Sequence, residues 1–173
     1  MGTGTRYKGE ALAMHGQYQE GVTQMCEGDV VDQSRGVRLY QTGMLYSLAQ
    51  AYAIASQPDQ GLITLDRALI LVEQTAEHHY EAELHRVRGE LALIQGDKAA
   101  AEASYRKAVE IALRQSGRSW ELRATLSLAR LWRQQGKAGQ ARESLASIYN
   151  WFTEGFDTPD LSEARALLKE LSI

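Results

Sequence analysis

The sequence predicts an all-α fold of four helical hairpins and one further helix, on three observations. Small residues in the first helix of each hairpin recur every 40 positions, at Gly9, Ala49, Gly89 and Ala129. Turn residues recur with the same step at Gly16, Ser56, Gly96 and Gly136. The second helices begin their core faces at Gly21, Gly61, Ala101 and Ala141. Three registers held over four copies indicate a repeat architecture.

The third hairpin shows the pattern most clearly. Two helical segments fold about Gly96-Asp97, and the second carries Ala101, Tyr105 and Ala108 at spacings of four and three, which puts them on one face. This small-large-small spacing after a Gly-Asp turn resembles the tetratricopeptide repeat (TPR). The resemblance implies a right-handed TPR-like α-solenoid of four 40-residue repeats plus a C-terminal capping helix. Since such units are usually about 34 residues long, each helix is expected to gain most of a turn.

We expect one domain, 1–173, with repeats at about 2–37, 38–77, 78–117 and 118–156. The helices are expected at 3–15, 18–33, 38–55, 59–75, 78–95, 98–115, 118–135 and 138–154. The first repeat is rich in glycine, and each helix-interior glycine costs about 0.5–1 kcal/mol, so this repeat is predicted to be the weakest. We expect the chain to be the C-terminal piece of a longer protein. A second chain covering the N-terminal face, or self-association through it, is an open alternative.

The ninth helix is expected at 159–171. The segment 158–172, which contains it, is expected to cap the array and to present a polar outer face. Gly155 is predicted to end the eighth helix in a left-handed conformation, with Phe156 folding back on Trp151 or Phe152. Thr158 and Pro159 are typical of an N-cap followed by the first helical position. We expect Trp151 to be buried where it fastens the cap. An exposed aromatic docking patch is the alternative.

Composition narrows the function classes. The formal net charge of −3 gives no positive field for nucleic acid or an anionic membrane. Cys26 is the single cysteine, so no intrachain disulfide or Cys-Cys metal knuckle is expected, and a reducing, cytoplasmic location is predicted. No segment has the pattern of a signal peptide or a membrane span.

No catalytic, cofactor or metal residues are predicted, and we do not expect an enzyme. The glycine-rich start, 2–9, lacks the Lys-Ser/Thr of a phosphate loop. His79 and His85 do not share a helical face, so with His78 they are expected to be solvated rather than metal ligands. Cys26, next to core position Met25, is expected to be a structural thiol.

The closing segments, 119–132 and 149–161, carry a more specific resemblance, strongest at Trp151-Phe-Thr-Glu-Gly-Phe-Asp157. They look like the C-terminal end of large bacterial signalling proteins. Those proteins join an adenylate/guanylate cyclase or another output domain to a signalling-type ATPase module and a TPR tail. The resemblance implies a regulatory or scaffold role, with a protein, a peptide or another domain of the parent chain as partner.

By the same resemblance, the first helix of each repeat lines a concave groove. The implied groove positions are Tyr46, Gln50, Ala53, Glu83, Arg86, Glu90, Leu93, Arg123, Leu126, Arg130 and Arg133. Guanidinium groups there would suit a carboxylate or phosphate ligand. Two function classes stay open: a protein-interaction module, and a sensor that binds a small effector in the groove.

A purely structural alternative pairs acid with base one repeat apart, as Glu83 with Arg123 and Glu90 with Arg130. Such exposed pairs contribute only about 0–1 kcal/mol each. Arg133 has no acidic equivalent one repeat earlier, which makes it the strongest single candidate for a ligand contact.

Overall fold

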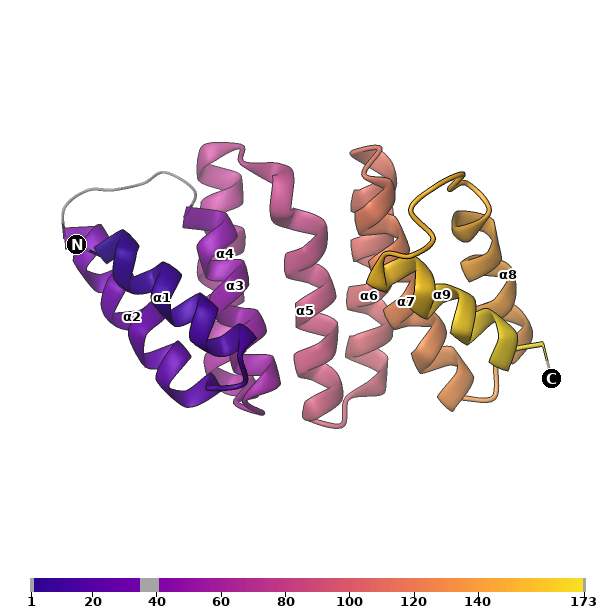
Figure 1. The fold of residues 1–173 in the computed structure, drawn as a ribbon, viewed down its shortest axis with the longest axis horizontal. Helices are drawn as coiled ribbons and strands as arrows, with labels where there is room; N and C mark the ends of the chain where they lie inside the picture. Colours follow the sequence, from indigo (N-terminus) through magenta and orange to yellow (C-terminus); the bar gives the residue numbers. More distant parts are fainter. Residues whose placement is uncertain (1, 35–40, 173) are drawn as a thin grey trace.

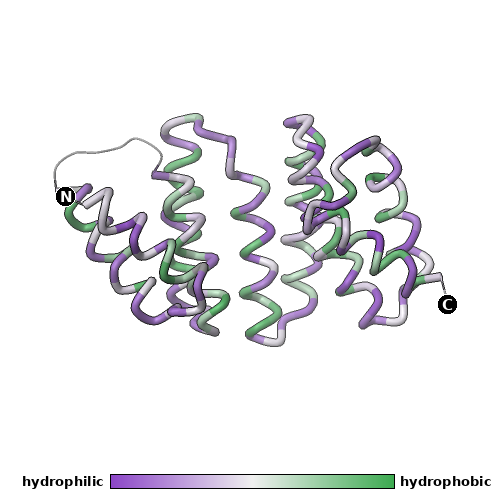
Figure 2. Tube along the Cα trace, in the orientation of Figure 1, coloured by the Kyte–Doolittle hydropathy of each residue, from purple (hydrophilic) through white to green (hydrophobic). Residues whose placement is uncertain are grey.

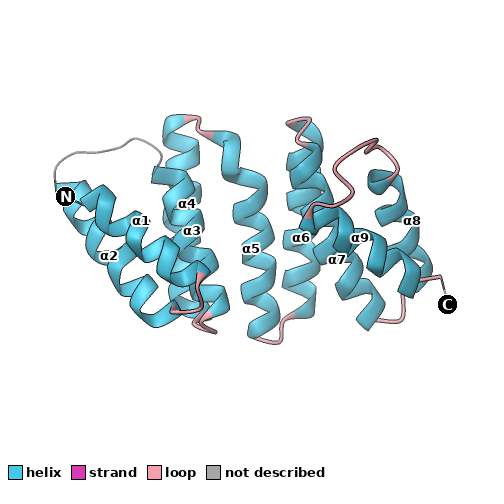
Figure 3. Ribbon diagram, in the orientation of Figure 1, coloured by secondary structure: helices cyan, strands magenta, loops and turns pink. Residues whose placement is uncertain are grey.

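The computed structural model describes residues 2–34 and 41–172, and every regular element in these ranges is helical (Figures 1 and 3). The elements are α1 (Gly2–Met14), α2 (Tyr18–Ser34), α3 (Gln41–Ile54), α4 (Pro58–Thr75), the 3₁₀ helix η1 (His78–Tyr80), α5 (Glu81–Ile94), α6 (Lys98–Arg114), α7 (Arg118–Gln134), α8 (Ala138–Tyr149) and α9 (Pro159–Glu170). The predicted all-α solenoid is therefore confirmed. None of the described helices is both long and apolar enough to cross a membrane.

The helices form four antiparallel hairpins that follow one another along the long axis of the molecule (Figure 1). The first helices α1, α3, α5 and α7 contact one another in succession, and α9 continues the row against α7. Successive second helices make no comparable contact within the described ranges. The first helices therefore form the inner layer of the array and the second helices the outer layer.

Each hairpin turn uses one residue in the left-handed region. Gly96 has φ +83°, and its N–H donates to the Leu93 carbonyl at 3.0 Å. Asp97 then starts α6 by accepting a hydrogen bond from the Ala100 N–H at 2.9 Å. Ser56 adopts the same region with φ +55°. The sequence prediction of these turns is confirmed.

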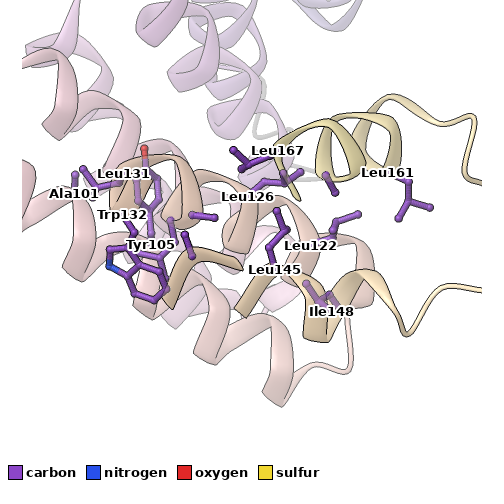
Figure 4. Packing of buried hydrophobic residues seen from close by; sticks show 14 of the residues in the cluster. Ala101, Tyr105, Leu122, Leu126, Leu131, Trp132, Leu145, Ile148, Leu161 and Leu167 are labelled. Carbon is purple, nitrogen blue, oxygen red and sulfur yellow. The ribbon is translucent and has the colours of Figure 1, made fainter. Parts of the chain in front are cut away.

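Buried apolar residues on the facing sides of the helices form the core, while polar residues alternate with them along each helix (Figure 2). Tyr105 is 2% exposed and lies under Gly89, where an added Cβ would stand 2.4 Å from its ring. The small residue of one helix thus receives the large residue of the next, as the spacing predicts. Figure 4 shows how Tyr105, Leu126, Trp132 and Leu145 continue this core toward α9.

Within the described ranges, two helix boundaries differ from those predicted by more than one residue. The fifth helix begins with the 3₁₀ turn η1, and its α-helical part starts only at Glu81. The eighth helix ends at Tyr149 rather than at 154. The predicted start of the third helix, at 38, lies outside the described residues.

The segment between α8 and α9 corrects the expected cap. Gly155 is left-handed, with φ +75°, but it stands beyond the end of α8 and does not cap it. Phe156 packs on Tyr149, with ring centroids 5.6 Å apart. Phe152 is half-buried against the core, whereas Trp151 is 55% exposed. The prediction that Trp151 is buried is wrong, because its indole lies outside the core beneath the Arg118 guanidinium, 5.3 Å from the ring centroid.

The start of α9 has the predicted positions, with Thr158 as the N-cap residue. Pro159 occupies the first turn. Thr158, however, makes no side-chain cap, because its hydroxyl donates to the Gly155 carbonyl at 2.7 Å. Leu161, Ala164 and Leu167 of α9 are buried and cover the end of the core.

Candidate binding surface

The groove positions expected from the sequence lie on α3, α5 and α7, three helices of the inner layer. Burial separates these positions into two sets. Tyr46, Glu83, Arg86 and Leu126 are buried. The positions left wholly or partly accessible are Gln50, Ala53, Glu90, Leu93, Arg123, Arg130 and Arg133. Only this second set is available to a ligand, so fewer of the expected groove positions can contact a ligand than the sequence indicates.

A buried polar network lies beneath the inner face. Glu83 is fully buried; it accepts a hydrogen bond from the Tyr46 hydroxyl at 2.9 Å and another from Arg86 Nε at 2.9 Å. Burial, helped by the neighbouring Glu83 carboxylate, raises the pKa of Tyr46 above its ordinary value. Burial alone would lower the pKa of Arg86, but the carboxylates of Glu90 and Glu83 outweigh it and raise that pKa. All members are satisfied, which is the condition for a buried ionic network to hold one fixed arrangement.

Arg123 connects this buried network to the surface. Its Nη1 lies 3.2 Å from Glu83 Oε2, so the predicted pairing of Glu83 with Arg123 is confirmed. Its Nε is 3.8 Å from an Asp160 carboxylate oxygen on α9. Its guanidinium carbon stands 5.6 Å from the centroid of Trp120. Because the Glu83 carboxylate is buried, this pair is not the exposed, weak pair that the sequence suggests.

The prediction that Glu90 forms an ion pair with Arg130 is wrong. Glu90 instead pairs with Arg86, one turn earlier on the same helix. Arg130 pairs with Glu163 of α9. Burial lowers the pKa of Arg130, and the nearby Glu90 charge acts in the opposite direction.

Arg133 also has an acidic partner, contrary to the expectation. It pairs with Glu170, near the C-terminal end of α9. Both side chains are about half exposed. The reason for choosing Arg133 as the strongest ligand contact is therefore wrong, although its side chain is exposed on α7.

An aromatic row that the sequence reading missed runs along the edge where α3, α5 and α7 begin. Tyr80 stacks on Tyr46, with centroids 5.4 Å apart and an interplanar angle of 26°. The edge of His79 meets Tyr80 at 4.9 Å, and Trp120 follows at 6.2 Å from Tyr80. A signal was present, because Tyr80 and Trp120 are one repeat apart in the sequence. Tyr40 has the same register but lies outside the described residues.

A cavity of about 470 Å³ opens beside this row, between the start of α3 and η1. Its lining residues are Thr42, Gly43, Ala76, Glu77, His78, His79 and Tyr80. Thr42 donates to Glu77 Oε2 at 2.9 Å across it. Gly43 lets the Tyr80 ring approach, since a Cβ there would lie 2.7 Å from a ring carbon. The cavity thus combines a polar pair with an aromatic wall.

The structure also places the histidine and cysteine residues singled out in the sequence. Within residues 2–34 and 41–172, no group of three or more His, Cys, Asp and Glu side chains is placed to hold a metal ion. His78 Nδ1 is 2.9 Å from a Glu81 carboxylate oxygen. Cys26 Sγ lies 3.3 Å from the Tyr52 hydroxyl. Burial and that contact raise the pKa of Tyr52 to about 12.

These features define a helical-repeat solenoid whose inner face carries ordered polar and aromatic side chains. The model of the tetratricopeptide repeat family matches residues 41–114, from α3 to α6. The chain is also similar to two crystal structures described as the nearly identical TPR-like repeats of a putative kinesin light chain from Podosopora anserina. Their TM-scores are 0.73 and 0.72, each with 17% identity, 98% of this chain and 84% of that chain covered. No curated protein sequence matches. The chain therefore has the fold of a TPR-type α-solenoid.

Proposed function

We propose that this chain is a non-catalytic protein-interaction module that binds a peptide, or another domain of its parent protein, on the inner face. The observation that carries the proposal is the setting of Arg123. Its guanidinium is held by buried Glu83 and by Trp120, yet the side chain remains 28% exposed. A donor fixed before binding loses little conformational entropy when a carboxylate or carbonyl reaches it.

The neighbouring groups suit an extended polypeptide. The aromatic row formed by Tyr80 and Trp120 offers apolar contact along the same edge, and Gln50 and Arg130 offer polar contacts farther along the inner helices. Aromatic and arginine side chains are the residues most often dominant at protein interfaces. The expected ligand is thus a segment with an acidic group near Arg123 and an apolar side chain near Trp120.

For the parent protein we propose a multidomain bacterial signalling ATPase or nucleotide cyclase, of which this chain is the C-terminal tail in the cytoplasm. The support is the resemblance of 149–161 to such tails, together with the free thiol of Cys26. Trp151 within that segment is exposed, so it is available to a neighbouring domain.

The experiment is a selection of peptides from a random phage-displayed library on the purified chain, followed by affinity measurement. Arg123→Gln and Trp120→Ala should each weaken the selected peptides by about tenfold or more, as interface anchors do. Arg142→Gln on α8, an exposed arginine of the outer layer, is the matched control and should leave affinity unchanged. Peptides that bind the two inner-face variants as well as the parent would show that the inner face is not the site.

The cavity beside Tyr80 favours a second candidate, a small-molecule sensor. Its volume of about 470 Å³ falls in the usual range for ligand pockets, about 300–1,000 Å³. A thermal-shift screen with small polar aromatic compounds separates the two candidates. A sensor predicts compounds whose stabilising effect is reduced in Thr42→Val, which removes the hydroxyl that donates to Glu77 across the cavity and keeps the shape of the side chain. The interaction module predicts peptide binding that tolerates this change.

A further inference from the structure

The outer face of α4 carries two large apolar side chains that no other element of the described ranges covers. Ile63 and Ile70 are 63% and 58% exposed. They are seven residues apart, two helical turns, and therefore lie on one stripe. Exposed isoleucines at this spacing make an apolar seam on the outer layer.

The repeats show that the fold does not require apolar residues there. One and two repeats along the chain, the positions equivalent to Ile63 are Ala103 and Glu143. Those equivalent to Ile70 are Glu110 and Asn150. Since α6 forms with a small and a charged residue at these places, and α8 with a charged residue at the first of them, the seam on α4 serves something beyond the stability of the helix.

Two opposite charges stand at the centre of this seam. Asp66 and Arg67 lie between the isoleucines on the same outward face, with side chains 63% and 47% exposed. Each is oriented by a neighbour in its own chain: Asp66 by Arg88 of α5, and Arg67 by Asp29 of α2. The order along the helix is thus apolar, acidic, basic, apolar.

That order is self-complementary when the helix meets a copy of itself in the opposite direction. A two-fold axis between positions 66 and 67 brings Ile63 onto Ile70 of the other copy, and Ile70 onto Ile63. It also brings Asp66 onto Arg67 and Arg67 onto Asp66. A single surface that satisfies itself in this way is what an isologous two-fold contact requires.

We propose that α4 docks a second copy of this chain through an antiparallel α4–α4 contact, with Ile63, Asp66, Arg67 and Ile70 at its centre. The same two-fold axis brings the Gln60 amide of one copy onto the Glu73 carboxylate of the other, which extends the pairing at both ends. A contact made by one helix from each protomer is small, and interfaces under about 1,200 Å² belong to weak assemblies. The dimer therefore forms reversibly.

The proposal is independent of the inner face. Because α4 belongs to the outer layer, the dimer leaves both inner faces open, and one particle then presents two equivalent peptide-binding surfaces. Two linked surfaces raise the apparent affinity for a bivalent or immobilised partner without any new contact. This contact is also distinct from self-association through the N-terminal face.

Sedimentation velocity of the full chain over about 1 µM to about 1 mM, a range that spans weak affinities, tests the proposal. The parent should change from monomer to dimer within this range. Ile70→Glu should abolish the change, while Ala103→Glu, the matched change on α6, should leave it intact. Circular dichroism melting of each variant shows whether it is folded.

A charge exchange gives the sharper test. Asp66→Arg and Arg67→Asp, made singly, each set like charges against one another and should raise the dissociation constant by about tenfold or more. The double variant restores opposite charges across the two-fold axis. It loses the own-chain partners Arg88 and Asp29, so it should bind more tightly than either single variant without reaching the affinity of the parent. A parent that sediments as a monomer at every concentration overturns the proposal. A double variant whose dissociation constant is as high as those of the single variants also overturns it. In either case the seam faces solvent or another protein.

Discussion

The backbones of Gly9 and Gly21 are in direct contact where α1 crosses α2. A Cβ on Gly9 would stand 2.5 Å from the Gly21 carbonyl oxygen, and one on Gly21 would stand 2.7 Å from the Gly9 carbonyl oxygen. Gly2 and Gly28 repeat the relationship one heptad away, at 2.6 Å in both directions. The glycines that the sequence reading counted only as a cost to the first repeat therefore let its two helices pack closely.

Gly9→Ala should destabilise the chain, against the usual preference of helices for alanine. The gain in helix propensity is about 1 kcal/mol, whereas forcing a methyl group into a packed backbone contact costs about 1–3 kcal/mol. Urea unfolding measures the balance. Gly4→Ala is the control on the same helix, since its Cβ would meet nothing within 4 Å, and it should stabilise. If both variants stabilise, the close crossing of α1 and α2 is wrong.

Glu83→Ala should cost about 3–5 kcal/mol, the range for breaking a buried pair and leaving the other charge uncompensated. The variant strands Arg86, which is 5% exposed, and removes the acceptor of the Tyr46 hydroxyl. Chemical denaturation followed by circular dichroism gives the free energy of unfolding. Glu110→Ala, at an exposed carboxylate of α6, should leave stability unchanged. Equal effects of the two variants would contradict a buried network at Glu83.

Stability should fall on acidification because of His85. Burial lowers the pKa of this histidine, Arg88 and Lys107 act in the same direction, and Glu81 and Glu110 oppose them. The unfolded chain takes up the proton near the ordinary pKa of about 6.5, and the folded chain only at a lower pH. The unfolded state thus binds more protons between these two values, and stability decreases as pH falls through that window.

Urea midpoints between about pH 7.5 and about pH 5, on either side of the ordinary histidine pKa, should show this loss. His85→Gln should reduce the slope with pH. His15→Gln, at an exposed histidine, is the control and should keep the slope of the parent. An unchanged slope in His85→Gln would assign the acid sensitivity to other groups.

Phe152→Ala should destabilise the C-terminal end more than Trp151→Ala does. Phe152 is packed against the core that includes Leu161 and Leu167, so its loss should cost about 1–3 kcal/mol, less than for a fully buried phenylalanine. Trp151 is mostly exposed and touches Arg118, which favours a change below about 1 kcal/mol. Thermal melts, together with hydrogen exchange over 159–170, compare the two variants. A larger loss of stability in Trp151→Ala than in Phe152→Ala would show that Trp151 is the residue that fastens α9.

The 40-residue period by itself determined the fold class and the residues that meet in the core. Small residues such as Gly89 and large ones such as Tyr105 recur in fixed register, and only a stack of similar hairpins buries them all. The same arithmetic found the contact of Glu83 with Arg123, because equivalent first helices lie side by side. Local chemistry likewise placed the turn at Gly96-Asp97, where one residue must be left-handed.

Only the tertiary structure decided the distances between side chains that the period brings near one another. Arg130 meets Glu163 rather than Glu90 or its equivalent Glu170, because α9 packs on α7 in a different register from that of the repeats, and Glu90 already has Arg86 one turn away. Burial of Glu83, the backbone contact of Gly9 with Gly21 and the exposure of Trp151 depend on how closely neighbouring helices approach. A sequence period shows which positions are equivalent, but helix separation and crossing angle are set by the packing of all side chains together.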